Sequence, residues 1–384
     1  MKFKVRVGCI TFNHAPYIKQ TLEGFCRQET NFPFVCTIID DASTDGEQNV
    51  ISNYLEEHFE LGNDSNVKKI ETGDYIQIFA QHNVNKNCFF LVLLLKYNHY
   101  VLNKSKIQYI SELRNSVEYT AICEGDDYWT DSRKLQLQVD FLEKHKECSM
   151  TCCRAKLYSV RDKIFAGDYY CHNFNGYLNP VDVINRTGLY INTCSIVYRQ
   201  SVIENYPEYC SKCKIGDYPL QIMGAMKGKI YYFNDAMCVY RICNPTSWMG
   251  SQITGRFDRK RLDIIDSKIR MFEGFASSFP RYKKIFNDII RYEINCNVPN
   301  WKADKEEVLK YLNYYSKEIE YYTIGWKVDL IIRKCKIPLV AWIYSRLVMN
   351  RFHPKRKYSV LYIICVVKTK FHNIFHRRVK RFGV

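Results

Sequence analysis

The stretch Ile122-Cys-Glu-Gly-Asp-Asp-Tyr-Trp129 decides the architecture of this chain, because an apolar run ends there in three closely spaced carboxylates. The run Tyr119–Cys123 has the composition of a strand, and the acids are Glu124, Asp126 and Asp127. Like charges at this spacing repel one another, so we expect a cation between them. Oxygen ligands suit a hard divalent ion, either Mg²⁺ or Mn²⁺. The alternative is a solvated acidic turn before a helix, where carboxylates complement the helix dipole.

Upstream of this stretch, strand and helix patterns alternate along the chain. Lys4–Thr11 alternates in the manner of a strand, and Ala15–Gln28 carries apolar residues at helical spacing. Phe34–Ile39 predicts a second strand and Glu47–His58 a second helix, whereas Phe89–Tyr100 fits either element. The order strand–helix–strand–helix predicts an α/β fold with a parallel sheet and crossover helices.

Downstream, Asp131 is expected to cap a helix, and a block of short strands follows. The strands expected there, together with one helix at Tyr218–Lys227, are Thr151–Ala155, Cys194–Tyr198, Lys229–Phe233 and Met237–Arg241. The pattern is helical from 257 to 322, and two further helices are expected at Val328–Met349 and Ser359–Phe375. We therefore expect a catalytic domain at 1–250, a helical extension at 251–325 and a basic amphipathic segment at 326–384.

A second pair of acids, Asp40 and Asp41, ends the Phe34–Ile39 strand. Ligands of open α/β sheets bind just beyond the carboxyl ends of the strands. Because two acid-tipped strands of one sheet can face one ligand, we expect Asp40 and Asp41 to contact it. For Ser43 and Asp45 we expect capping of the following helix.

Two later residues have two interpretations each. Asp217 stands at the start of a helix, where it either caps the helix, as Pro219 suggests, or acts as a general base toward a substrate hydroxyl. Arg241 follows an apolar strand, where it either pairs with a diphosphate or forms a surface salt bridge. The sequence leaves both pairs of alternatives open.

In this order, the motifs resemble those of family 2 glycosyltransferases. Val5–Leu22 is similar to the family's opening strand, loop and helix, and Ile39–Asp45 to its nucleotide-binding turn. Cys123–Leu142 resembles its metal motif and the helix that follows. The resemblance covers about residues 3–250. It implies a GT-A fold, a Rossmann-like mixed sheet flanked by helices, with a C-terminal helical region added.

The resemblance also implies roles for individual residues. Asp217 corresponds to the catalytic base, and Asp126 to the main metal ligand, with Glu124 and Asp127 in support. The residues that would bind the nucleotide-sugar are Thr11, Asn13, Asp40, Asp41, Glu124, Gly125, Asp126 and Arg241.

The activity that the resemblance implies is an inverting, Mn²⁺- or Mg²⁺-dependent transfer from a nucleotide-diphosphate sugar. A UDP-sugar is the expected donor, the sugar being hexosyl or N-acetylhexosaminyl. A hydroxyl of a glycan or lipid-linked acceptor in cell-surface polysaccharide synthesis would receive it. Two other functions compete with this one: a non-catalytic, membrane-associated nucleotide-sugar binder, and a metal-dependent nucleotidyltransferase.

The basic excess of the chain is concentrated at its C-terminal end. Of a formal net charge of +16, residues 326–384 contribute +14, with fifteen Lys and Arg and the single acid Asp329. Bulky apolar residues alternate with these cations, as in a helix that lies in a membrane interface. We expect peripheral attachment to the inner face of the cell membrane; the alternative is a helical subdomain with a solvated basic face. Nucleic-acid binding is not expected, because no nucleic-acid fold motif is present.

The 17 cysteines form an odd-numbered set without a regular framework, and the chain begins directly with a strand pattern. We therefore expect reduced thiols in a cytoplasmic protein. Cys210 and Cys213 have the spacing of zinc ligands, but no second such pair accompanies them. The longest apolar runs, Phe89–Leu95 and Tyr358–Val367, fall well short of the roughly 20 residues that span a bilayer.

Overall fold

The computed structural model of the protein describes residues 2–61, 68–186, 188–244 and 259–296. The expected helices at Val328–Met349 and Ser359–Phe375 lie outside these residues. Two compact units divide the chain, the first being Met1–Gly255 with Asp266–Ile289 and the second Arg256–Ile265 with Ile290–Val384. The domain boundaries near 250 and 325 remain predictions.

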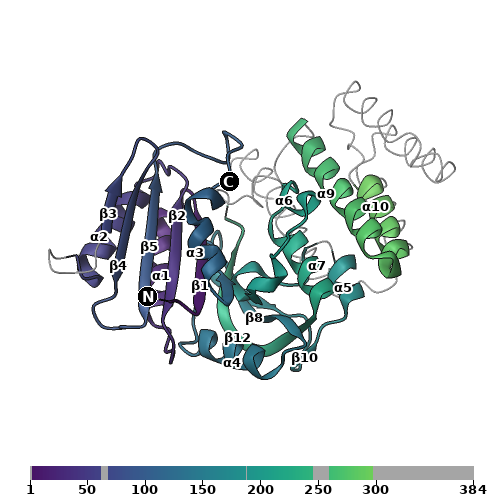
Figure 1. Cartoon of the computed structure of the whole chain (residues 1–384), viewed down its shortest axis with the longest axis horizontal. Helices are drawn as coiled ribbons and strands as arrows, with labels where there is room; N and C mark the ends of the chain where they lie inside the picture. The colour runs from purple at the N-terminus through teal and green to yellow at the C-terminus, as the bar shows by residue number, and fades with distance from the viewer. Residues whose placement is uncertain (1, 62–67, 187, 245–258, 297–384) are drawn as a thin grey trace, which may run out of the picture. The chain divides into compact units, whose positions relative to one another are not determined.

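A twelve-stranded mixed sheet forms the centre of the first unit (Figure 1). Its middle is parallel: β1 (Val5–Thr11) lies between β2 (Phe34–Asp40) and β6 (Tyr119–Ile122), and β5 (Cys88–Leu95) lies beyond β2. In this register Thr11 pairs with Asp40. The carboxyl ends of these strands therefore meet at one edge of the sheet.

The outer strands make the sheet mixed, as predicted. On one side β4 (Tyr75–Gln81) runs antiparallel to β5, and β3 (Lys68–Glu71) to β4. On the other, β11 (Val197–Arg199) runs antiparallel to both β6 and β8. The remaining strands are β7 (Tyr128–Trp129), β8 (Cys148–Ser159), β9 (Ile164–Tyr169), β10 (Gly176–Tyr177) and β12 (Lys229–Ile242).

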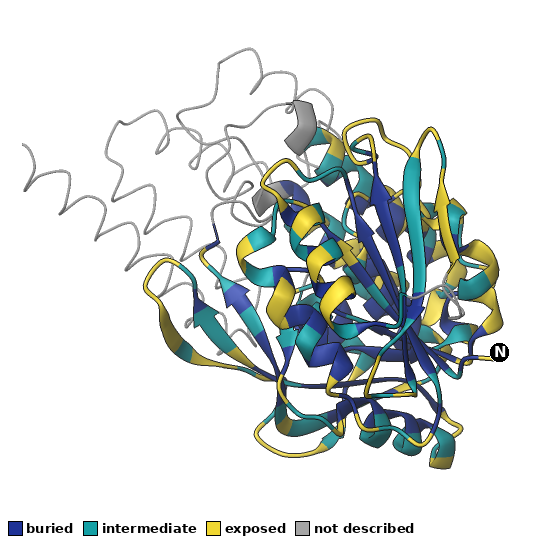
Figure 2. Cartoon of the chain, turned by 90° about the vertical axis from the view of Figure 1, so that its left-hand side faces the viewer, coloured by how far each residue is buried: buried dark blue, intermediate teal, exposed yellow. Residues whose placement is uncertain are grey.

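Helices cover both faces of the parallel centre. The main core packs α1 (Ala15–Cys26), α2 (Glu47–His58) and α4 (Lys134–Lys144) against the sheet. The opposite face is covered by η1 (Ile107–Ile110) and α3 (Ser111–Ser116). Every residue of β2 is consequently buried, which is typical of a parallel strand, and Figure 2 shows the buried centre of the sheet in dark blue.

The remaining helices follow β9 in the chain. They are α5 (Pro180–Asn185), η2 (Thr193–Ser195), η3 (Gln200–Val202), α6 (Glu208–Ser211), α7 (Asp217–Lys227), α9 (Arg259–Ser278), η4 (Pro280–Tyr282) and α10 (Lys283–Cys296). Within the first unit, the Phe272 ring of α9 packs edge-on against Tyr218 of α7, with centroids 5.6 Å apart. Among the described residues, no helix combines the length and the apolar character needed to cross a bilayer.

Several elements differ in extent from the sequence prediction. The ambiguous run Phe89–Tyr100 is a strand only as far as Leu95. The two runs expected at Lys229–Phe233 and Met237–Arg241 form one strand, β12, which is interrupted by shifts in register near Ala236. A single β-bulged strand looks like two strands in sequence because the irregularity breaks the alternation of side chains.

The cysteines are free thiols throughout the described part of the chain, and all of them are buried except Cys243. Burial raises the pKa of thiols such as Cys123 and Cys153 well above the ordinary range. Cys210 and Cys213 are buried in the same way. No group of three His, Cys, Asp or Glu side chains among the described residues could hold a metal, so this pair remains without partners for zinc.

Candidate active site

The acid turn after β6 is fastened to β1 and α1 by close backbone contacts. The Gly125 amide donates to the Ile10 carbonyl at 3.2 Å, and the Thr21 hydroxyl donates to the carbonyls of Gly125 and Asp127 at 3.0 and 2.6 Å. A Cβ atom on Gly125 would lie 1.9 Å from Thr11 Oγ1. Only glycine therefore allows the turn to approach the end of β1 this closely.

The three carboxylates of this turn have different surroundings. Glu124 is exposed at the edge of the sheet, but the protein around it displaces enough water to raise its pKa to about 8, helped by the charges of Asp126 and Asp217. Asp126 is nearly buried, with its Oδ2 3.7 Å from Nε2 of His14. Asp127 is fully buried, and burial raises its pKa well above the ordinary value.

The expected three-carboxylate metal site is not assembled. The Asp127 carboxylate turns inward, where its Oδ1 accepts a hydrogen bond from the Arg241 amide at 2.8 Å. Consecutive residues of a tight turn point in different directions, so proximity in sequence did not bring the three side chains together. Glu124 and Asp126 remain at the mouth of the site. Their mutual repulsion and hard oxygen atoms fit a divalent cation such as Mg²⁺ or Mn²⁺.

Asp40 and Asp41, at the end of β2, make different contacts. Oδ1 of Asp40 accepts hydrogen bonds from the Ser43 amide at 3.0 Å and from Gln48 Nε2 at 2.6 Å. Its Oδ2 is buried and has no hydrogen-bond partner among the described residues. This oxygen therefore has unused hydrogen-bonding capacity at the site, and burial raises the pKa of the Asp40 carboxyl.

Asp41 does not face the site with a free oxygen, contrary to the expectation of ligand contact. Its Oδ1 accepts from the His99 amide at 2.7 Å and its Oδ2 from the Tyr100 amide at 3.1 Å. Lys106 Nζ lies 2.8 Å from the same Oδ2. Both oxygens are therefore occupied in fixing the segment after β5.

Thr11 and Asn13 lie in the loop between β1 and α1, and both are joined to the loop after β2. The Asn13 amide donates to Ser43 Oγ, and the Thr44 amide donates to Asn13 Oδ1, each at 2.8 Å. Asn13 has a positive φ of 56°, a conformation that asparagine tolerates better than most residues. As expected, Asp45 accepts from the first amide of α2, that of Glu47, at 3.1 Å.

Glu47 is a functional candidate that sequence reasoning missed. Its side chain is fully buried and accepts hydrogen bonds from the Thr11 hydroxyl, from the His14 amide at 2.8 Å and from Ser43 Oγ at 2.9 Å. One carboxylate thus ties together the two loops that flank the acid turn. In sequence, an acid in the first turn of a helix suggests only interaction with the helix dipole, so no signal distinguished it.

Asp217 is the first residue of α7, and Gly216 is the N-cap residue. Oδ2 of Asp217 accepts from the Thr193 hydroxyl at 3.2 Å. Burial raises its pKa, and its charge in turn contributes to the raised pKa of Glu124. The two carboxylates therefore interact across the site, and a raised pKa suits a general base that works near neutral pH.

Arg241 is neither a surface residue nor directed toward the mouth of the site. Its guanidinium is buried between the rings of Tyr17 and Tyr128, at 4.9 and 4.6 Å from their centroids. It donates to the Asp126 carbonyl and to the Gln20 side chain. Burial rules out the surface salt bridge, and these contacts give Arg241 a role in supporting the acid turn, whereas contact with a diphosphate remains a prediction.

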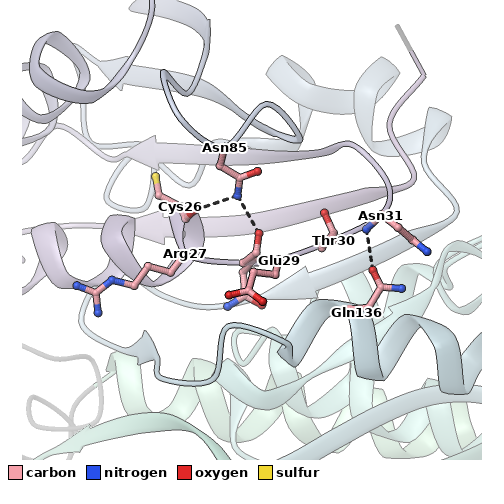
Figure 3. Close-up of a pocket in the computed structure, with 8 residues that line it drawn as sticks. Cys26, Arg27, Glu29, Thr30, Asn31, Asn85 and Gln136 are labelled. Atoms are coloured by element: carbon pink, nitrogen blue, oxygen red, sulfur yellow. Dashed lines mark hydrogen bonds between the residues drawn. The ribbon is translucent and has the colours of Figure 1, made fainter.

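A groove of about 630 Å³ lies away from these residues, between the end of α1 and the loop before β5 (Figure 3). Asn85 Nδ2 crosses it to the carbonyls of Cys26 and Gln28, and the Asn31 amide donates to Gln136. Apart from Gln136 of α4, the residues that line the groove precede β2 and β5, at the amino edge of the sheet. The groove is therefore separate from the acid turn.

Comparison with known proteins shows what this chain is similar to. Residues 7–75 match the sequence model of glycosyl transferase family 2. The uncharacterised protein Rv1520 of Mycobacterium tuberculosis is 29% identical over 232 residues, 60% of this chain, as is the uncharacterised protein Mb1547 of Mycobacterium bovis. The match spans 57% of the length of these curated relatives.

Solved structures show the same fold. Residues 1–349 of TarS from S. aureus in complex with UDP-GlcNAc superpose with a TM-score of 0.55 at 14% identity, covering 91% of this chain and 89% of TarS 1–349. The complex of the same protein with UDP gives 0.51 over the same shares. The protein therefore has the GT-A fold of these structures, and its residues 7–75 are similar in sequence to glycosyl transferase family 2.

Proposed function

We propose that this protein transfers a sugar, with inversion, from a UDP-sugar to a hydroxyl of a glycan or lipid-linked acceptor in cell-surface polysaccharide synthesis. The observation that carries the proposal is that Asp217 lies close enough to the acid turn for its charge to act on Glu124, whose pKa is raised mainly by burial and further by the charges of Asp126 and Asp217. A base on one side and anionic oxygen ligands on the other leave room for a reacting centre between them.

In this mechanism Asp217 accepts the proton of the acceptor hydroxyl. The hydroxyl oxygen then attacks the anomeric carbon from the face opposite the diphosphate, and the bond to the diphosphate breaks. Asp126 and Glu124 would hold Mn²⁺ or Mg²⁺, which when bound supplies positive charge for the departing diphosphate. Arg241 positions Asp126 by holding its carbonyl.

Donor recognition is assigned to the ends of β1 and β2. The unpartnered Oδ2 of Asp40 can accept an N–H of the nucleotide base, and Gly125 lets the acid turn pack closely beside Thr11. Asn13 belongs to the same pair of joined loops. That the TarS structures contain UDP and UDP-GlcNAc supports a uridine donor.

An Asp217→Asn variant tests the catalytic assignment. We expect turnover to fall by about 10²–10⁴-fold, because a positioned base contributes that much, while binding of UDP-GlcNAc with Mn²⁺ persists in calorimetry. Asp182→Asn, an acid of α5, is the control. Unchanged turnover in Asp217→Asn would remove the assigned base.

The products of the reaction distinguish a glycosyltransferase from the two alternatives, a nucleotidyltransferase and a non-catalytic nucleotide-sugar binder. A glycosyltransferase releases a nucleoside diphosphate, whereas a nucleotidyltransferase releases pyrophosphate. A non-catalytic binder retains donor affinity and releases neither. A thermal-shift series with UDP-sugars, with and without Mn²⁺ and Mg²⁺, identifies the donor and tests metal dependence in one experiment.

We further propose that the protein works in the cytoplasm, attached to the inner face of the membrane through residues 326–384, which lie outside the described residues. Their charge of +14 supports this assignment. Flotation with anionic liposomes, with and without residues 326–384, tests it. Equal binding of the two proteins would contradict it.

A further inference from the structure

The segment that follows β5 and includes the first residue of η1, residues 96–107, combines lysines with exposed apolar side chains. It contains three lysines and no acid. Its exposed large apolar residues are Tyr97, Tyr100, Val101, Leu102 and Ile107. An exposed apolar surface of this kind on a folded domain usually marks a site of interaction.

The exposure is built into the fold of the segment. The Asp41 carboxylate accepts hydrogen bonds from the His99 and Tyr100 amides. The His99 side chain is buried, with its Nε2 2.9 Å from the Tyr109 hydroxyl. The Val101 amide donates to Asn98 Oδ1 at 2.8 Å. The backbone is therefore fixed on its inner side, and the apolar side chains are presented outward.

The surface also carries positive charge. Lys106 is paired with Asp41 and Lys96 with Glu71. Lys104 and Lys214 are exposed, and no acid forms an ion pair with either in the described part of the chain. Lys214 Nζ donates to Asn103 Oδ1 at 2.9 Å, so its charge lies against the segment.

We propose that residues 96–107 dock on an anionic lipid surface, with Val101 and Leu102 in the interface and Lys104 and Lys214 toward the headgroups. Apolar side chains flanked by cations match such a surface in both chemistry and charge, and tyrosines favour the interfacial depth. This inference goes beyond the proposed function, because vesicle binding needs no donor, metal or turnover.

The position of residues 96–107 relates the proposed membrane contact to the acid turn. The segment follows β5 at the carboxyl edge of the sheet, and Asp41, its anchor, directly follows Asp40. Docking there brings the edge that carries the acid turn close to the bilayer. A lipid-linked acceptor could then reach the site while its lipid remains in the membrane.

The test compares two exposed valines on opposite edges of the sheet. Val101 is 77% exposed in the segment, and Val84 is 83% exposed in the loop before β5. In the full chain, Val101→Asp is expected to weaken co-sedimentation with phosphatidylglycerol vesicles by about tenfold, whereas Val84→Asp leaves it unchanged. Equal binding by both variants, or equal binding of the unsubstituted protein to phosphatidylcholine vesicles, would overturn the proposal.

A second measurement is independent of any membrane contact made by residues 326–384. Val101→Trp and Val84→Trp each add one fluorophore at an exposed position. With brominated phosphatidylglycerol, we expect quenching of the added emission in Val101→Trp only. Absence of quenching in Val101→Trp would rule out insertion. If Val101→Asp then lowered turnover on a soluble glycan alone, the segment would be an acceptor site instead.

Discussion

At the scale of single residues, Gly125 decides how closely the acid turn can approach β1. Gly125→Ala places a methyl group 1.9 Å from Thr11 Oγ1, so either Thr11 or the turn must move. We expect a loss of about 2 kcal/mol in the free energy of unfolding, as is usual for overpacking, together with weaker donor binding. Urea unfolding and calorimetry measure the two effects. Gly73→Ala, whose added methyl group meets nothing within 4 Å, is the control.

Glu143 gives a prediction for pH. Hydrogen bonds from Tyr119, Lys146 and Lys4 lower its pKa from 4.5 to about 2. A lowered pKa in the folded state means that the stabilisation is complete above about pH 4.5 and is lost as pH falls toward 2. Glu143→Gln should therefore cost about 1 kcal/mol at pH 7 and progressively less below pH 4.5.

Urea unfolding of both proteins between pH 7 and pH 3 measures this difference. Glu56→Gln, an exposed position on α2, should show no such trend. A difference between Glu143→Gln and the unsubstituted protein that stayed constant over the whole range would contradict the prediction.

Individual side chains were predicted least well from the sequence. Strand ends and their acids could be located, because an apolar run that stops at a carboxylate is visible in the sequence. Directions could not be predicted, since neighbouring residues of a turn diverge and Asp127 points away from Asp126 into the protein. The burial of Glu47 and Arg241 depends on contacts with residues far away in the chain, which no local pattern contains.

At the scale of elements, the loop after β5 depends on one carboxylate. Asp41→Asn removes the charge opposite Lys106 and one of the two acceptor oxygens used by His99 and Tyr100. We expect the protection of these two amides against hydrogen exchange to fall by about tenfold, while that of β2 is retained. Asp74→Asn, in the exposed turn before β4, provides the comparison. If the protection of the His99 and Tyr100 amides were unchanged in Asp41→Asn, other contacts of the segment would be sufficient to fix its backbone.

The strands of the parallel centre and the helices between them agree closely with their sequence predictions. The alternation of β1 and the helical spacing of α1 and α2 come from local periodicity, and the predicted bounds of α2 agree with the structure. The bounds were least certain where strands are irregular. In β12 the shifts in register come from its pairing with β8, and such pairing is not encoded within the strand itself.

At the scale of the whole molecule, residues far beyond the sheet support the proposed base. Phe272 of α9 packs on Tyr218, the neighbour of Asp217. Phe272→Ala should lower the free energy of unfolding by about 3 kcal/mol through the cavity it leaves, and should also reduce turnover because α7 loses its backing. Denaturation and product assays test both. Phe279→Ala, two turns further along, should leave turnover nearly intact.

The order of motifs predicted the mixed α/β fold and the similarity to glycosyl transferase family 2, because both follow from elements that are visible in the sequence. The contact between α9 and α7 was not predicted, since helical spacing shows which face is apolar but not which partner covers it. This contact also places residues 266–289 in the same compact unit as the sheet.

The distribution of thiols has a practical consequence. Within the described residues only Cys243 meets solvent, two positions after Arg241. A maleimide dye would therefore attach there first and report on events beside the acid turn without any engineered cysteine. The other thiols of this part are buried, so the slower rate at which they are labelled measures how often the structure around each of them opens.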